Sequence, residues 1–357
     1  MDKVEKNITN RDMYQLMFFD GEKNNHAGFK APQDVRSIMA GMGFEEIDIN
    51  VSYRATDNGI LAGIRYLRAI FQCFDIFRKI KKNSVVFIQT PTGGGAVRDY
   101  VLKKLKEKKE VRIITLFHDI EALRGLENKG EDTFFKRILQ LSDGIIVHNS
   151  RMRDWFISQK IFSGKIVCLD VFDYLFTPMK RERKLLRQVI IAGNLSPDKV
   201  KYIAKIRDVG SAFILYGPNY DEMTAGDNMT YKGSFSPDEL PHILEDGFGL
   251  IWDGDSVETC SGMFGQYLRY NNPHKLSLYL ASGLPVFIWK EAAEAEFVEK
   301  NGVGYTISSL HDIASILDSI TDDEYKALCE RVNRISSELV SGTYTKRAVT
   351  ELLSEIE

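Results

Sequence analysis

The 357-residue sequence has only four cysteines, and they lie far apart, at Cys73, Cys168, Cys260 and Cys329. No two of them have the CxxC spacing of a redox or zinc motif, and their scatter is unlike that of a disulfide scaffold. Cys260 lies in a Thr-Cys-Ser-Gly stretch without a base beside it in sequence, so we interpret it as a small packed residue. The cysteine content therefore predicts a protein of a reducing compartment.

Long apolar runs and a strong excess of one charge are also missing. No run approaches the roughly 20 apolar residues of a membrane-spanning helix, and the first residues, MDKVEKNITNRD, have no apolar signal core. The 47 basic and 50 acidic residues give a net charge of −3, which argues against a nucleic-acid surface. We therefore expect a soluble, cytoplasmic protein that binds no nucleic acid, with peripheral membrane contact left open.

The chain is too long for one ordinary core, and its pattern divides it in two. Short apolar segments alternate with helical patterns twice, as expected for parallel, doubly wound α/β sheets. The expected strands are 13–19, 47–51, 85–89, 111–117, 144–147 and 166–169, then 189–192, 212–216, 248–252, 284–289 and 304–307. A basic segment around Arg181 to Arg187 separates the two sets. We predict domains at 1–182 and 183–342, facing a cleft, and a last helix, 343–357, that packs back on the first.

The segment from Gly249 to Lys290 contains the most informative pattern of the second half. An apolar strand ends in a polar turn, and Asn271-Asn272-Pro273-His274-Lys275 begins a helix, where proline suits the first turn. A helix start collects unpaired N–H groups, and Lys275 adds a positive charge there, so the pattern favours a phosphate-binding site. The alternative is that Lys275 is a solvated surface lysine.

Two other motifs are ambiguous. Asp253-Gly254-Asp255 has the D-x-D form of some metal-dependent transferases, but the basic helix start that follows could neutralise a diphosphate without a metal. A loop-shaping or sugar-contacting role and a purely structural turn are the other interpretations. Thr92-Gly93-Gly94-Gly95 is neither a GxGxxG motif nor a phosphate-binding P-loop. It is either a flexible turn at the edge of the cleft or an acceptor contact.

The first half offers candidate bases at the end of an expected strand. His118 and Asp119 follow the strand 111–117, with Glu121 and Arg124 shortly after. One interpretation is a buried ion-paired network around Arg124. The other is a general base for an acceptor hydroxyl, with Asp119 as first choice and Glu121 and His118 behind it.

The segment from Gly249 to Gly262 (GLIWDGDSVETCSG), followed by Tyr267-Leu268 and the Asn-Asn-Pro-His-Lys helix start, resembles bacterial β-1,6-galactofuranosyltransferases of O-antigen and capsule assembly. The likeness covers nearly the whole chain. More remotely, the order of elements is similar to that of the glucosyltransferases that act on streptococcal serine-rich adhesins. Further matching segments are His26-Ala27-Gly28-Phe29-Lys30-Ala31, the stretch from His118 to Gly125, Ala192-Gly193-Asn194-Leu195-Ser196 and Lys232-Gly233-Ser234-Phe235.

The resemblance implies a GT-B fold, with two Rossmann-like domains, and an inverting transfer from a UDP-sugar without a metal or another cofactor. It implies that the diphosphate is held at the helix start and covered by a loop of the first domain. The implied donor-binding residues are Ala27, Gly28, Lys30, Gly193, Asn194, Lys199, Tyr216, Gly217, Asn271, Asn272, Pro273, His274, Lys275 and Leu276, and we add Asp253 and Asp255 for the sugar. Lys275 would also stabilise the leaving diphosphate.

We therefore expect a transferase of galactofuranose from UDP-galactofuranose to a glycoside or lipid-linked oligosaccharide. A UDP-glucose-dependent glucosyltransferase is the alternative enzyme, and a non-catalytic GT-B scaffold subunit is the alternative of another class. The glucosyltransferase relatives have a shorter loop before the helix start, so the segment 259–271 is where a furanose would be distinguished from a pyranose. Relatives suggest a homo-oligomer. Basic residues between Arg65 and Lys82 face either an anionic inner-membrane surface or solvent.

Overall fold

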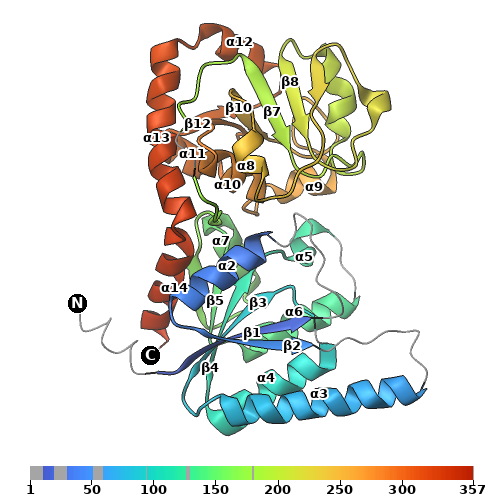
Figure 1. Ribbon diagram of the computed structural model, residues 1–357, viewed down its shortest axis with the longest axis vertical. Coiled ribbons are helices and arrows are strands. Elements are labelled where there is room, and N and C mark those ends of the chain that lie inside the picture. Colours follow the sequence, from blue (N-terminus) through green and yellow to red (C-terminus); the bar gives the residue numbers. More distant parts are fainter. Residues whose placement is uncertain are drawn as a thin grey trace.

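The computed structural model describes residues 11–19, 30–50, 59–93, 95–125, 129–178 and 181–356. Within these ranges the chain forms two six-stranded sheets, one after the other along the sequence, and the neighbouring strands are parallel. Figure 1 shows the sheets as two lobes, one above the other, with helices packed around each. The two-domain α/β architecture expected from the sequence is confirmed.

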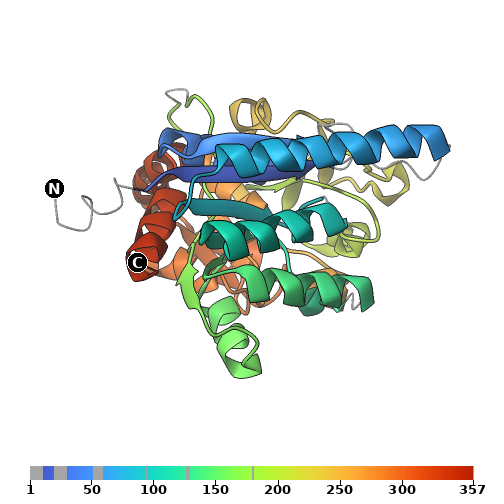
Figure 2. The same ribbon diagram turned by 90° about the horizontal axis from the view of Figure 1, so that it is seen from below.

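The first sheet has the strand order β2-β1-β3-β4-β5-β6. Its strands are β1 (Met13–Phe19), β2 (Glu45–Asn50), β3 (Val85–Thr90), β4 (Arg112–Phe117), β5 (Gly144–Val147) and β6 (Lys165–Cys168). Its helices are α2 (Lys30–Gly41), α3 (Gly59–Lys79), α4 (Gly95–Lys109), α5 (Glu121–Arg124), α6 (Lys129–Leu141) and α7 (Ser150–Gln159). Figure 2 shows α3, α4 and α6 side by side across the face turned away from the second domain.

The second sheet has the order β12-β11-β10-β7-β8-β9. Its strands are β7 (Gln188–Ala192), β8 (Ala212–Tyr216), β9 (Met229–Tyr231), β10 (Phe248–Ile251), β11 (Val286–Trp289) and β12 (Gly304–Ile307). Its helices are η2 (Lys201–Asp208), η3 (Glu222–Thr224), α8 (Leu240–Ile243), α9 (Gly262–Tyr267), α10 (His274–Ala281), α11 (Ala295–Asn301), α12 (Asp312–Ser319) and α13 (Asp322–Val340).

Burial explains why the strands are recognisable in the sequence. Every residue of β3, β5, β10 and β11 is buried, and strands covered on both faces form continuous apolar runs. The edge strand β2 alternates instead, with Ile47 and Ile49 inside. The sequence did not predict α9, because its six residues are too few to show helical periodicity.

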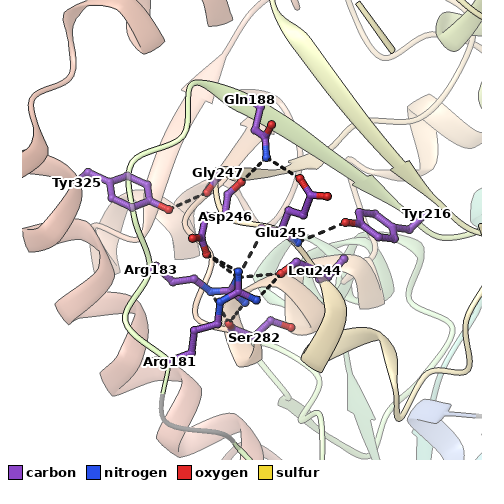
Figure 3. A network of polar contacts seen from close by, with 10 residues as sticks. All are labelled: Arg181, Arg183, Gln188, Tyr216, Leu244, Glu245, Asp246, Gly247, Ser282 and Tyr325. Carbon is purple, nitrogen blue, oxygen red and sulfur yellow. Dashed lines mark hydrogen bonds and ion pairs between the residues drawn. The ribbon is translucent and has the colours of Figure 1, made fainter. Parts of the chain in front are cut away.

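The linker between the sheets is tied to the second domain by two arginines. Arg181 and Arg183 both bind the Asp246 carboxylate, at 2.8 and 3.0 Å, and both donate to the Leu244 carbonyl. Figure 3 shows this network, in which Tyr325 of α13 also donates to the Gly247 carbonyl. The basic segment therefore anchors the linker to the loop that precedes β10.

The last helix, α14 (Thr343–Glu355), leaves the second domain and packs against α2, β5 and β6 of the first, as Figure 1 shows at the left. Asp173 accepts hydrogen bonds from the backbone N–H groups of Tyr344 and Thr345 and so holds the start of α14. A Cβ on Gly144 would lie 2.6 Å from Leu352 Cδ1, so this strand meets the helix closely. The returning helix is confirmed, whereas the boundaries 1–182, 183–342 and 343–357 stay a prediction.

Among the described residues, no helix combines the length and the apolar character that a membrane crossing requires.

Candidate active site

The candidate site lies where the carboxyl ends of β4 and β5 meet the loops and helix start of the second domain. In the second domain the relevant segments follow β7, β8 and β10 and include the first turn of α10. Among the contacts that join the halves, Tyr267 Oη lies 3.2 Å from Asp119 Oδ1, and the Asn272 N–H lies 2.9 Å from His148 Nδ1. Ligands of open parallel sheets bind at such strand ends.

Lys275 is a largely buried, ion-paired cation on the first turn of α10. Its Nζ lies 2.8 Å from Asp253 Oδ1 and 3.1 Å from the Trp252 carbonyl. The side chains of Lys275 and Asp253 are 13% and 8% exposed, so the solvated-lysine interpretation is wrong. Burial lowers the pKa of Lys275, whereas the Asp253 charge acts in the opposite direction. The site thus holds a positive charge that lacks most of its hydration.

The two aspartates of the D-x-D turn have different partners. Asp253 pairs with Lys275, whereas Asp255 lies on the exposed side, 3.8 Å from Lys201 Nζ. Within the described ranges no three His, Cys, Asp or Glu side chains gather as metal ligands would. That sugar transfer needs no metal stays a prediction, which an activity assay with a chelator tests.

Glycine holds the turn after β10 in place. Gly254 has φ +106°, and a Cβ there would lie 1.9 Å from the Ser261 carbonyl oxygen. Its N–H donates to the Lys199 carbonyl and its own carbonyl accepts from the Tyr202 N–H, both at 3.1 Å. The loops after β7 and β10 therefore form one connected wall of the site, into which Cys260 is packed as a fully buried residue.

The loops after β7 and β8 approach each other at two glycines. Gly193 donates to the Tyr216 carbonyl, and a Cβ on Gly217 would lie only 1.7 Å from the Gly193 carbonyl oxygen. The Tyr216 side chain is buried, so a ligand at this loop could reach only its backbone. Asn194 is exposed and accepts from Ser196 N–H.

Asp119 is the best placed of the candidate bases. Its side chain is 37% exposed and lies 3.9 Å from Arg124 Nη1. Burial raises its pKa, while the charge of Arg124, the Tyr267 hydrogen bond and the charge of Lys199 lower it. Glu121 is instead bound to Arg124 at 2.9 Å, so the ion-paired network and an available carboxylate coexist.

His118 and His148 lie in the boundary between the domains. His118 Nε2 is 2.6 Å from Gln89 Oε1 and its ring stacks on Phe172. Burial lowers the pKa of His118 to about 3 and that of His148 to about 4. The His118 imidazole is therefore neutral and bound to Gln89, which leaves Asp119 as the freer base.

Asn272 connects the two domains. The sequence resemblance implied a place at the diphosphate for this residue and did not predict its contacts with the first domain. Its Nδ2 donates to the carbonyls of His148 and Asp170, and its Oδ1 accepts from Asn149 Nδ2 at 2.7 Å. Asn149 also donates to the Tyr270 carbonyl. In this structure the polar atoms of the Asn272 side chain point into the first domain, so they do not face an open anion site.

Lys30 is likewise committed to the domain boundary. Its ammonium lies 2.9 Å from Asp34, 2.8 Å from Asp238 of the second domain, and within hydrogen-bonding reach of the Leu175 carbonyl. The side chain is 7% exposed. Lys30 therefore links α2 to the second domain in this structure. The other predicted loop residues, Ala27 and Gly28, lie outside the described residues.

The remaining residues of the helix start have apolar or backbone roles. His274 stacks on Tyr174 at 5.0 Å, burial lowers its pKa to about 4, and its Nε2 is buried without a hydrogen-bond partner among the described residues. Pro273 precedes the first helical residue, and its carbonyl accepts from the N–H of the fully buried Leu276. Asn271 also has a buried side-chain oxygen without a described partner.

The contacts of the Tyr267 and Asn149 side chains were not predictable, because their partners are distant in the chain. At the glycine run, Arg98 Nη1 binds the carbonyls of Thr92 and Gly93, at 2.8 and 3.1 Å. These contacts fix the first part of that turn, while Gly94 lies outside the described residues.

Comparison with known proteins shows the family. Two models match: the glucosyltransferase 3-like N-terminal domain over residues 13–171 and the glucosyltransferase 3-like C-terminal domain over residues 189–352. The chain is 41% identical over 251 residues to the beta-1,6-galactofuranosyltransferase WbbI of Escherichia coli K12, covering 69% of this chain and 72% of that protein. It is 23% identical to glucosyltransferase 3 of Streptococcus gordonii, over 91% and 94% of the two chains.

Among solved structures, Alr3699/HepE of Anabaena, determined with UDP and glucose, has a TM-score of 0.58 over 96% of this chain and 99% of that one. At 12% identity this likeness concerns the fold alone. The two facing parallel sheets, the returning helix and the two matching family models agree. The chain belongs to the glucosyltransferase 3-like family and is a glycosyltransferase with the GT-B fold.

Proposed function

We propose that the protein transfers galactofuranose from UDP-galactofuranose to a hydroxyl of a glycoside acceptor, with inversion and without a metal, in the synthesis of O-antigen or capsule. The 41% identity to a β-1,6-galactofuranosyltransferase supports the sugar. Two observations carry the proposal. The Asp119 carboxylate of the first domain contacts Tyr267 of the second, and Lys275 holds a largely buried positive charge on the first turn of α10. The Lys199 charge acts on the pKa of both Asp119 and Lys275, so Lys199 lies within electrostatic reach of each.

The proposed step needs one base and one anion-stabilising group. Asp119 accepts the proton of the acceptor hydroxyl while that oxygen bonds to the anomeric carbon from the face opposite UDP. The bond from the anomeric carbon to the diphosphate oxygen breaks, and its electron pair leaves with UDP. Lys275 and the positive end of the α10 dipole stabilise the charge that grows on the diphosphate.

The first experiment is an assay of UDP release with UDP-galactofuranose and UDP-glucose side by side, with and without EDTA, over a panel of simple glycoside acceptors. We expect turnover of the furanose donor and no effect of EDTA. Preference for UDP-glucose would identify a glucosyltransferase instead, and loss of activity with EDTA would refute metal independence. UDP binding without turnover of any donor would favour a non-catalytic scaffold.

Asp119→Asn tests the base in the same assay. We expect UDP affinity to be kept and kcat to fall by about 10²- to 10⁴-fold, as for loss of a general base. Asp154→Asn is the control, because Asp154 is exposed on α7 and its ion-pair partner is the neighbouring Arg153. Unchanged transfer by Asp119→Asn would remove Asp119 as the base, and loss of transfer in Glu121→Gln alone would assign the role to Glu121.

We also propose that α3 contacts the inner face of the cytoplasmic membrane, where a lipid-linked acceptor would lie. Phe71 and Phe74 are 69% and 65% exposed, Ile64 is 57% exposed, and the exposed Arg68 lies on the same stretch of helix. An exposed apolar face with basic residues is typical of interfacial helices. Figure 1 shows α3 at the end of the molecule farthest from the second domain.

Flotation with vesicles that contain anionic lipid tests this contact. We expect the wild type to float with the vesicles and Phe71→Ser/Phe74→Ser to remain in the unbound fraction. Met223→Ser is the control and should float, because Met223 is a 91% exposed side chain on the other domain. Equal flotation of all three proteins would refute the contact. The homo-oligomer suggested by the resemblance is a separate proposal. If the molar mass measured by light scattering fell in the Phe71→Ser/Phe74→Ser variant, the exposed face of α3 would be the interface between copies of the chain.

A further inference from the structure

Tyr267 is a buried residue of the second domain that reaches the candidate base of the first. It is 3% exposed, at the end of α9, and its hydroxyl lies 3.2 Å from Asp119 Oδ1. The same hydroxyl lies 3.1 Å from the backbone nitrogen of Ile120. The Arg124 guanidinium lies 5.2 Å from the centre of the Tyr267 ring.

These contacts fix the direction of the hydroxyl hydrogen. A tyrosine hydroxyl has one hydrogen to donate and lone pairs to accept with. The Ile120 N–H can only donate, so the Tyr267 oxygen accepts there and its hydrogen is left for the Asp119 carboxylate. Burial and the neighbouring Asp119 charge both raise the pKa of Tyr267, so the phenol stays protonated.

We propose that Tyr267 is a positioning residue for transfer: its hydroxyl holds the Asp119 carboxylate toward the acceptor and makes that alignment depend on contact between the two domains. The inference rests on the proposed role of Asp119. Tyr267 follows Cys260 and Ser261 in the loop expected to distinguish the donor sugar. A donor that orders this loop would therefore also order the base.

The charges around Asp119 give the proposal a specific signature. Arg124 on α5 and Lys199 on the loop after β7 face Asp119, Tyr267 donates to it from α9, and Glu121 faces Arg124. Removing the hydroxyl leaves these charges in place and removes one hydrogen bond that favours the ionised carboxylate. The pKa of Asp119 then rises, and activity that needs the ionised form is lost at a higher pH than in the wild type.

The experiment compares the pH profiles of kcat and kcat/KM for the wild type, Tyr267→Phe and Tyr325→Phe. Tyr325 is the matched control, because it is a buried tyrosine whose hydroxyl donates to the Gly247 carbonyl in the linker network (Figure 3). For Tyr267→Phe we expect a kcat about tenfold lower, donor KM within about twofold of the wild type, and an acid limb displaced to higher pH. The Tyr325→Phe profile should keep the wild-type acid limb.

Fluorotyrosine at position 267 supplies a second test if the phenylalanine variant does not fold. The more acidic phenol donates more strongly, so the acid limb should move to lower pH. An unmoved acid limb in both proteins, or equal shifts in Tyr325→Phe, would overturn the proposal. Asp119→Asn distinguishes failure of the proposed base from failure of the proposed positioning role. If Asp119→Asn transfers the sugar normally, Asp119 is not the base. If Asp119→Asn is inactive and Tyr267→Phe is normal, only the role of Tyr267 is refuted.

Discussion

Lys275 carries a charge in an almost buried position, and its only described carboxylate partner is Asp253. Breaking a buried ion pair by removing one partner leaves the other charge without compensation. A loss of activity in a Lys275 variant could therefore come from instability rather than from loss of a diphosphate contact. The two causes are separable, because replacing both partners removes the unpaired charge.

We expect Lys275→Met to lose transfer activity and about 3 kcal/mol of unfolding free energy. The double variant Lys275→Met/Asp253→Asn should recover most of that stability and none of the activity. Urea unfolding and UDP release on the same preparations measure both effects. Wild-type turnover in the double variant would show that the diphosphate lies elsewhere.

The crossing of the loops after β7 and β8 depends on backbone shape rather than on side chains. Gly217 has φ +143°, which L-residues rarely adopt, and the Gly193 carbonyl fills the place of its missing side chain. Any Cβ there would separate the two loops that border the expected nucleotide.

Gly217→Ala should therefore lower the unfolding free energy by at least about 2 kcal/mol and weaken UDP binding. Gly210→Ala is the matched control, because the nearest atom to its added Cβ would be Ala314 Cβ at 3.9 Å. Calorimetric titration with UDP and chemical unfolding report the two effects. Similar affinities for the two variants would contradict the role given to the loop crossing.

The strands and long helices were predictable because their signals are local. The buried runs of β3 and β10 and the helical periodicity of α3 lie within single stretches of sequence. The roles of Lys30 and Asn272 were not predictable, because their partners are distant in the chain. Lys30 binds Asp238, and Asn272 binds His148. The sequence pattern predicted where α10 begins, while the partners of its side chains needed the structure.

The boundary between the domains contains three imidazoles whose charging would oppose the folded state. Burial lowers the pKa of His118 to about 3 and those of His148 and His274 to about 4, and the Phe172 ring contacts all three. An unfolded histidine takes up its proton near pH 6.5. The unfolded chain therefore binds more protons between about pH 6.5 and 4, and these groups lower stability as the pH falls through that range.

Two aspartates oppose this trend. Burial raises the pKa of both Asp34 and Asp173 to about 6, so the folded state binds their protons first as the pH falls. Asp119 and Glu294, whose pKa burial also raises, act in the same direction. The histidine contribution is therefore isolated by substituting one imidazole.

His148→Gln should reduce the acid loss of stability by about 1.4 kcal/mol per pH unit, the linkage of one proton. Glutamine can still donate to the Phe117 carbonyl that faces His148 Nε2. His311→Gln is the control, because His311 is exposed at the start of α12. Urea unfolding from pH 7 to pH 4.5 measures the slopes, and identical slopes for all three proteins would show that His148 does not contribute.

The chain passes between the domains twice, once in the linker and once between α13 and α14, and the two passages touch. Tyr174 donates to the Leu339 carbonyl, and Asp173 binds the first turn of α14. Mechanically, the two passages act as one pivot at the edge of the molecule. Figure 1 places α5 and α9 on the opposite edge from α13 and α14. A rotation about this pivot displaces atoms in proportion to their distance from it, so a small opening angle separates Tyr267 from Asp119 first and leaves the pivot intact.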